Sequence, residues 1–327
     1  MAQLTYRESV SLSIAQAMRK DPKVFFIGED VGAAGGVFKA TVGLLDEFGK
    51  ERVMDTPISE QAILGAAMGA AMAGLRPIAE IMFSDFLAVC WDIVANQIAK
   101  TRYMSDGQIN IPLVIRTANG GGSKFGAQHS QSLENWSMMI PGLKVVAPSS
   151  PGDVLGLMNS AVNDPDPVIF YEHKSLYASK EELESTELSI PLGQANILHE
   201  GSDITIIGLA LMAQRAKKAA VELKEKHNIN AKVIDLRTLV PLDLQSIKSA
   251  INETGLAMTV EENPRLCGWG AEISSLITEH CFSNLKGPVT RLTTPHVPLP
   301  SADILEDNTI PSVDVIVKEV IKKVKGE

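Results

Sequence analysis

The hydrophobic pattern along the chain switches repeatedly between two periods. Short apolar runs such as Val24–Ile27 and Ile204–Ile207 end in glycine or polar turns, as buried parallel strands do. Between these runs, apolar residues recur every three to four positions, which is the spacing of an amphipathic helix. Regular alternation of strands and helices predicts an α/β fold with parallel sheets.

The pattern also predicts how the chain is divided. In the first part we expect strands at 24–27, 52–54, 77–82, 112–116, 143–147 and 168–171, and helices at 9–18, 60–74, 85–100, 133–139 and 152–163. In the second part we expect strands at 204–207, 231–236, 256–260 and 289–292, and helices at 212–227, 244–253, 271–282 and 312–325. The polar stretch Lys174–Ser189 has charges but no period, which favours a linker. We therefore predict two domains, residues 1–180 and 181–327.

Composition narrows the class of protein. The 327 residues are 45% hydrophobic and 21% charged, which excludes intrinsic disorder. Thirty basic residues against 39 acidic ones give a net charge of −9, which argues against nucleic acid or an anionic membrane as the partner. This balance is typical of an enzyme that handles small molecules.

Other features predict a cytoplasmic protein. The first residues lack the basic start and apolar core of a signal peptide, and no apolar stretch approaches the roughly 20 residues of a membrane helix. The three cysteines, Cys90, Cys267 and Cys281, are far apart and lie in apolar surroundings. This usage predicts buried thiols in a reducing compartment rather than a disulfide.

Three glycine clusters invite a phosphate-binding interpretation, which none of them supports strongly. Gly65, Gly69 and Gly74 lie within a predicted helix, where small residues favour close packing against a neighbour. The Gly120–Gly122 loop follows a strand but lacks the lysine and hydroxyl residue of a P-loop. Gly268 and Gly270 open a helix, which serves helix entry or the binding of an anion at the helix start.

Candidate side chains for catalysis follow predicted strands. Glu60 begins a helix after a strand and has apolar neighbours; it is either a partner of the helix dipole or a buried acid for proton transfer. Glu29 and Asp30 follow another strand, as solvated turn residues or as further site acids. His129 lies among small and polar residues after a glycine-rich loop, where a working histidine and a packed one are equally plausible.

Several motifs in the same order carry a family resemblance. They are Gly28–Val31, Asp55–Glu60, Gly69–Pro77, Ala127–Gln131, Pro141–Val146 and Asp166–Ile169. Together they resemble the β subunits of thiamine-diphosphate-dependent 2-oxoacid and acetoin dehydrogenases, and the likeness spans almost the whole chain. It implies a transketolase-like pyrimidine-binding domain followed by a transketolase-like C-terminal domain.

The resemblance also implies roles for individual residues. Glu60 matches the glutamate that hydrogen-bonds N1′ of the cofactor's aminopyrimidine and favours its imino tautomer. Glu29 matches a second cofactor-side acid, Ile58 a residue lining the pyrimidine pocket, and Phe86 an aromatic residue packed on that ring. His129 matches a histidine facing the active-site channel, which assists proton transfer or reductive acylation of the lipoyl group.

Metal ions and partners are implied in the same way. In some relatives, residues matching Leu113, Ala161, Val162, Asp164 and Asp166 hold a structural potassium ion, mostly through main-chain carbonyls. The chain has no Gly-Asp-Gly motif for binding the diphosphate through Mg²⁺, and in the family this motif lies on the α subunit. The resemblance therefore implies an α₂β₂ heterotetramer that works with a lipoyl-bearing acyltransferase core and dihydrolipoamide dehydrogenase.

The substrate is the least determined part. The segments Glu172–Lys174, Glu262–Arg265, Thr294–Pro300 and Leu305–Asp307 look closer to acetoin dehydrogenase β subunits, or are structural turns that say nothing of substrate. Pyruvate enzymes tend to have an acidic residue at the position of His296. Alternatives are a pyruvate or branched-chain 2-oxoacid dehydrogenase, a fragment acting on sugar phosphates, and a scaffold subunit without catalysis. Glu29, Glu60 and His129 argue against the scaffold.

Overall fold

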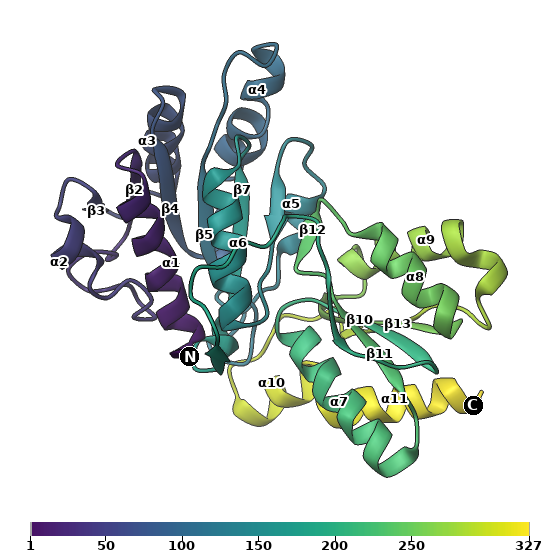
Figure 1. Cartoon of the computed structure of the whole chain (residues 1–327). Helices are drawn as coiled ribbons and strands as arrows, with labels where there is room; N and C mark the ends of the chain where they lie inside the picture. The colour runs from purple at the N-terminus through teal and green to yellow at the C-terminus, as the bar shows by residue number, and fades with distance from the viewer. Residues whose placement is uncertain (1, 327) are drawn as a thin grey trace. The chain divides into compact units, whose positions relative to one another are not determined.

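The chain folds into two compact units (Figure 1). The computed structural model describes residues 2–326. The N-terminal unit comprises Met1–Asn119 and Trp136–Leu192, and the C-terminal unit comprises Gly120–Asn135 and Gly193–Glu327. A segment of 16 residues from the first part of the sequence, which carries His129, therefore belongs to the C-terminal unit.

The N-terminal unit is built on parallel strands in the order β3-β2-β4-β5-β7-β6. Their bounds are β2 (Val24–Gly28), β3 (Val53–Asp55), β4 (Arg76–Phe83), β5 (Val114–Asn119), β6 (Lys144–Val146) and β7 (Val168–His173). Every residue of β5 and β7 is buried, as the middle strands of a sheet covered on both faces must be. All six strands match runs predicted from the apolar pattern.

Helices cover both faces of this sheet. Their bounds are α1 (Tyr6–Lys20), α2 (Leu44–Phe48), α3 (Glu60–Met72), α4 (Thr101–Met104), α5 (Glu134–Met138) and α6 (Pro151–Asn163). Helices α1 and α6 pack against each other, and α3 packs on β2 and β4. Local sequence defines where α1 and α6 begin, because Thr5 forms a capping box with Glu8 and the Ser150 hydroxyl accepts a hydrogen bond from the Asp153 N–H.

The predicted helix over residues 85–100 is interrupted in the structure. The chain instead forms a 3-10 helix (Ser84–Ala88), a π-helix (Ile93–Ile98) and then α4. The breaks coincide with two edge-to-face aromatic contacts. Phe86 lies 5.4 Å from Phe83 and Trp91 lies 5.8 Å from Trp136, measured between ring centroids.

The polar stretch taken for a linker is partly structured and belongs to the N-terminal unit. It contains a short 3-10 helix (Lys174–Leu176) and β8 (Lys180–Leu183), which pairs antiparallel with β1 (Ala2–Thr5). The linker prediction was wrong because β8 is stabilised by pairing with β1, which lies far away in the sequence, and the local pattern does not show this pairing. The C-terminal unit resumes at Gly193.

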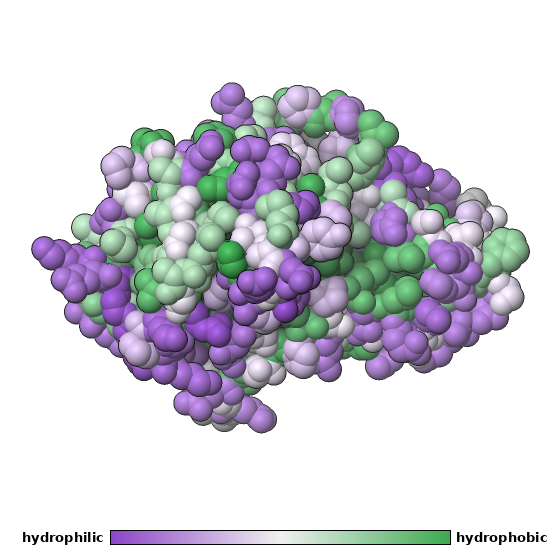
Figure 2. All heavy atoms as spheres, turned by 90° about the horizontal axis from the view of Figure 1, so that it is seen from above, coloured by the Kyte–Doolittle hydropathy of each residue, from purple (hydrophilic) through white to green (hydrophobic). Residues whose placement is uncertain are grey.

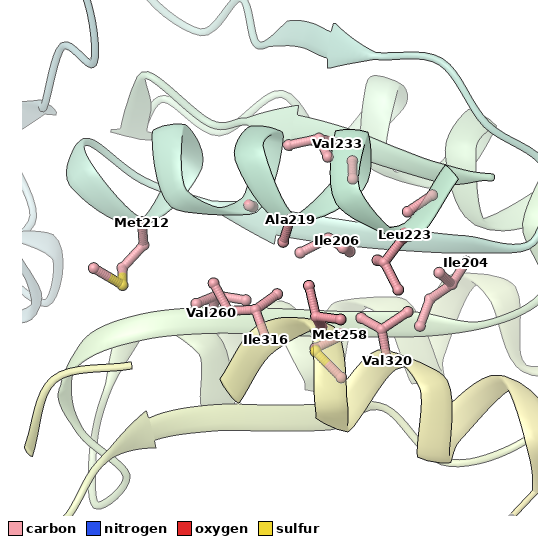
Figure 3. Close-up of a cluster of buried hydrophobic side chains, with 14 of the residues drawn as sticks. Ile204, Ile206, Met212, Ala219, Leu223, Val233, Met258, Val260, Ile316 and Val320 are labelled. Carbon is pink, nitrogen blue, oxygen red and sulfur yellow. The ribbon is translucent and has the colours of Figure 1, made fainter. Parts of the chain in front are cut away.

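The C-terminal unit has a second sheet, in the order β14-β13-β10-β11-β9, with only β9 antiparallel to its neighbour. The bounds are β9 (Asn196–His199), β10 (Ile204–Gly208), β11 (Ala231–Asp235), β12 (Thr238–Val240), β13 (Ala257–Pro264), β14 (Thr290–Thr294), α7 (Leu211–His227), α8 (Leu244–Thr254), α9 (Trp269–Cys281), α10 (Asp303–Thr309) and α11 (Val313–Lys325). Helices α7 and α11 contact each other, as do α8 and α9 on the other face. Figure 3 shows Leu223 of α7, Met258 of β13 and Val320 of α11 converging in one fully buried apolar core.

Cysteine burial differs from the prediction at one position. All three cysteines are free, and Cys90 and Cys281 are buried as expected, but Cys267 is exposed. It lies in the turn between β13 and α9, where its φ is 56°. Within residues 2–326, no helix combines the length and the apolar character that crossing a bilayer requires.

Candidate active site

Side chains from three neighbouring strands meet at one edge of the N-terminal sheet. Strands β3, β2 and β4 are adjacent and parallel, so their carboxyl ends lie together. Glu29 follows β2, Glu60 begins α3 after β3, and Phe86 lies in the 3-10 helix after β4. Ligands of open α/β sheets bind at this edge.

Glu29 and Glu60 form a pair of buried carboxylates. Each side chain is only 8% exposed. Burial raises the pKa of Glu29, the neighbouring charge of Glu60 raises it further, and a hydrogen bond from the Ser59 main chain opposes the shift. The Oε1 atom of Glu29 is buried and accepts no hydrogen bond. The site thus holds a buried acid with one oxygen that lacks a donor, which a polar group of a ligand would provide.

Short glycine-rich backbone shapes the loop that follows β2. A Cβ at Gly28 would stand 2.9 Å from the Cβ of Glu80, and one at Gly32 would stand 2.9 Å from the Oδ2 of Asp55. Asp55, at the end of β3, accepts hydrogen bonds from the N–H groups of Gly32 (2.7 Å) and Ala33 (3.1 Å). The loop is therefore held against β3, and this fixes the backbone beside Glu29.

A buried ionic cluster next to Glu29 was missed by the sequence analysis. Arg116 of β5 donates to both oxygens of Glu172 (2.7 and 2.6 Å) and to Glu80 of β4. Tyr177 donates to Glu172 at 2.8 Å. Burial raises the pKa of Glu80 to about 7, and the charge of Glu29 is one of the smaller causes. A glutamate and an arginine within otherwise apolar strands were the available signal.

Apolar side chains also belong to this edge of the sheet. Phe86 is half-buried, while Ile58 and Val89 are exposed at 83% and 60%. Burial, together with the nearby charge of Glu60, raises the pKa of Cys90 to about 12, so this thiol is not a nucleophile. The surface has other exposed apolar residues, and Figure 2 shows green hydrophobic patches among purple hydrophilic side chains.

His129 lies in the C-terminal unit, on a loop that is anchored by buried acids. Glu262 of β13 accepts hydrogen bonds from the Gly121 N–H (2.5 Å) and the Ser132 hydroxyl (3.2 Å). Glu306 of α10, which is fully buried, accepts from the Lys124 N–H at 3.2 Å. Two residues from the segments that resemble acetoin enzymes thus have a structural role, whereas His296 is exposed.

The residues of the expected potassium site surround a turn at the end of α6. The main-chain oxygens of Leu113 and Ala161 accept hydrogen bonds from Val168 and Asp164, and that of Val162 accepts one from Arg76. The carboxylate of Asp164 binds Lys144, and that of Asp166 binds Lys144 and Arg102. A potassium ion does not fit this donor set unless a side-chain cation leaves.

Comparison with known proteins supplies the family. Residues 2–180 match the family model described as transketolase, pyrimidine binding domain, and residues 193–316 match the one described as transketolase, C-terminal domain. The chain is 43% identical to the acetoin:2,6-dichlorophenolindophenol oxidoreductase subunit beta of Bacillus subtilis, over 98% of this chain and 96% of the relative. The chain belongs to the β subunits of thiamine-diphosphate-dependent 2-oxoacid and acetoin dehydrogenases. The α/β fold class, the family and the assignment to an oxidoreductase component are thereby confirmed.

Relatives within this family of β subunits are named for different substrates, but they are equally similar to this chain. The 2-oxoisovalerate dehydrogenase subunit beta of Bacillus subtilis is also 43% identical, over 94% of each chain. The mitochondrial pyruvate dehydrogenase E1 component subunit beta-1 of Arabidopsis thaliana is 43% identical, over 97% of this chain and 88% of the relative. A solved structure titled split gene transketolase, inactive beta4 tetramer, has a TM-score of 0.82 at 22% identity over 98% of each chain, and supports the fold alone.

Proposed function

We propose that this chain is the β subunit of the first component of an acetoin dehydrogenase complex. In this reaction acetoin is cleaved and its two-carbon unit passes to a lipoyl group. The observation that carries the cofactor-binding part of the proposal is the buried pair Glu29 and Glu60, with an oxygen of Glu29 that no donor satisfies. Two relatives at 43% identity are named as acetoin oxidoreductase β subunits, from Bacillus subtilis and Cupriavidus necator. Oxidative decarboxylation of pyruvate or of a branched-chain 2-oxoacid is the alternative, since relatives with those names are equally similar.

The site suits the aminopyrimidine half of thiamine diphosphate. When bound, this cofactor supplies a carbon nucleophile for attack on a carbonyl group. Glu60 would hold a proton at N1′ of the ring, and a buried carboxyl group does so without competition from water. Glu29 would accept from a ring substituent through its unsatisfied oxygen, while Phe86 and Ile58 would contact the ring faces. The apolar rim would exclude water from these atoms.

An α subunit is proposed to complete the site. The sequence has no Gly-Asp-Gly motif for the diphosphate and Mg²⁺, so those ligands would come from the partner. Helix α3 supports this: its sequence is apolar on all sides, yet Ala62, Ala66 and Gly69 are exposed, and no atom lies within 4 Å of a Cβ built at Gly69. An apolar helix of this kind is normally covered. The close packing expected of this glycine stripe would then be met in an α₂β₂ heterotetramer.

His129 is proposed to serve transfer to the lipoyl group. An imidazole is the side chain that most often transfers protons in catalysis, and the loop that carries His129 is held in place through Glu262 and Glu306. The acceptor would be a lipoyl arm of the acyltransferase core, which dihydrolipoamide dehydrogenase then reoxidises.

The test is a substrate comparison with the chain co-purified with its α partner. Acetoin, pyruvate and 2-oxoisovalerate are each supplied with thiamine diphosphate, Mg²⁺ and 2,6-dichlorophenolindophenol, and kcat/KM is measured. We expect acetoin to be preferred by at least about tenfold, the discrimination that about 1.4 kcal/mol provides. A preference for a 2-oxoacid would agree with the family but would contradict acetoin as the substrate. An intact assembly without cofactor-dependent turnover would contradict the proposed function.

A further inference from the structure

The turn that joins α6 to β7 is held by cations of the chain itself. The Nζ atom of Lys144 lies 2.6 Å from both carboxylate oxygens of Asp164 and 3.4 Å from Asp166. Arg102 pairs with the other oxygen of Asp166. The guanidinium of Arg76 donates to the carbonyl oxygen of Val162 at 2.9 Å. Lys144 and Arg76 thus contact this turn from two different strands, β6 and β4.

The turn has no negative charge left for a further cation. Its two carboxylates, Asp164 and Asp166, are matched by the two cations Lys144 and Arg102. Two of the expected carbonyl ligands also already accept one hydrogen bond each: Leu113 accepts from the Val168 N–H at 2.9 Å and Ala161 from the Asp164 N–H at 3.2 Å. The side chain of Asp164 is only 13% exposed, so its pairing with Lys144 is partly shielded from solvent ions.

We propose that Lys144 and Arg76 take the place that related β subunits give to a structural potassium ion. An ammonium group has the charge of a potassium ion and a similar size, and it binds the same oxygen ligands. Being covalently attached, it does not leave when the ionic composition changes. The fold and the assembly of this β subunit are therefore independent of potassium.

The position of the turn makes this consequential for the site. Strand β7 starts directly after the turn, at Val168, and carries Glu172. Glu172 holds Arg116, which in turn binds Glu80 beside Glu29. Because side chains of the chain itself hold the turn, the position of the first residue of β7 is fixed. The position of Glu172 in the buried cluster is then fixed as well.

The first test uses the wild-type chain assembled with its α partner and saturated with thiamine diphosphate and Mg²⁺. Thermal unfolding is followed in KCl, NaCl and tetramethylammonium chloride at equal ionic strength. We expect the three Tm values to agree within about 1 °C, and potassium to be absent from the protein by elemental analysis after dialysis. A Tm several degrees higher in KCl, or retention of one potassium per chain, would overturn the proposal. Neither readout depends on the substrate, so its result is separate from that of the proposed function.

The second test removes the ammonium group and keeps the side-chain volume. Lys144→Met leaves Asp164 without its cation, and we expect a lower Tm that KCl raises by about 3 °C relative to tetramethylammonium chloride. Lys226→Met is the control, because Lys226 forms an ordinary surface pair with Glu222. It should change the Tm little and show no preference for potassium. If Lys144→Met folds and responds like this control, the turn is not a cation site; if it fails to fold, the wild-type measurement decides.

Discussion

Both units bury glutamates at the carboxyl ends of parallel strands, yet they satisfy them differently. In the C-terminal unit, Glu261 is fully buried and accepts two hydrogen bonds from Arg291 at 2.8 Å. It accepts others from the Thr259 hydroxyl (2.8 Å) and from the Gly270 N–H (3.0 Å) at the start of α9. In the N-terminal unit, Glu29 has a like charge beside it and an oxygen with no donor.

The difference separates a structural acid, Glu261, from Glu29, for which we propose a functional role. Burial alone does not mark a site, because a buried carboxylate with a full set of donors stabilises the fold around it. The start of α9 was a candidate anion site, and the anion it receives is the chain's own Glu261. Glu29 remains uncompensated, which costs stability and is retained where a ligand supplies the missing partner.

The largest effect is expected at Glu60. Glu60→Gln keeps the shape of the side chain but removes the carboxyl group that we propose to exchange a proton with the cofactor ring, so turnover in the assembled enzyme should fall by about 10³-fold. Assembly, measured by gel filtration with the α partner, should be unchanged. Glu51→Gln, an exposed acid of the same unit, is the matched control. Near-normal activity of Glu60→Gln would show that the cofactor assignment is wrong.

At Glu261 the loss should appear in stability instead. Glu261→Gln leaves Arg291, whose side chain is only 10% exposed, without its charge partner, and we expect the free energy of unfolding to fall by roughly 3–5 kcal/mol. The measurement is denaturant unfolding of the chain, followed by circular dichroism. Glu253→Gln, at a surface acid that is 55% exposed, should cost less than about 1 kcal/mol. Equal losses in the two variants would remove the contrast between the two kinds of acid.

The sequence predicted the helices and strands that are determined by residues within the segment itself. Helix α6 was expected at 152–163 and is found at Pro151–Asn163, because its cap and apolar spacing are contained in the segment itself. The pairing of β1 with β8 was missed, since its partners lie far apart along the chain.

Only part of the candidate site could be predicted from the sequence. Glu29 and Glu60 could be placed at strand ends, but their closeness depends on β2 and β3 being neighbours in the sheet. The cofactor roles predicted for them rest on the family resemblance. The residues expected to hold potassium would do so mostly through main-chain oxygens, which any side chain permits, so the pattern could not show that Lys144 and Arg76 bind at this turn.

Glu80 extends the comparison of buried glutamates to the pH dependence of stability. The pKa of Glu80 is raised to about 7 in the folded chain, because burial favours the protonated form. The folded state is therefore most stable with respect to this group below the pKa that Glu80 has in the unfolded chain, and this stability is lost as the pH rises through 7. Glu80→Gln removes this loss. We expect the stability of the variant relative to wild type to improve by up to about 3 kcal/mol between pH 4.5 and pH 8. Urea unfolding across this range measures it, and a difference that does not change with pH would contradict the raised pKa.

The smallest effect, with a sign opposite to that at Glu261, is expected at Glu29. Glu29→Gln removes a charge that is buried beside Glu60, so the chain without cofactor should gain on the order of 1 kcal/mol at pH 8. Because the pKa of Glu29 is raised in the folded state, the penalty exists only where this acid is ionised, and the gain should shrink as the pH falls. Affinity for thiamine diphosphate, measured by calorimetry on the assembled enzyme, should fall at the same time. A variant that is less stable at pH 8 would place Glu29 with Glu261, among the acids that hold the fold together.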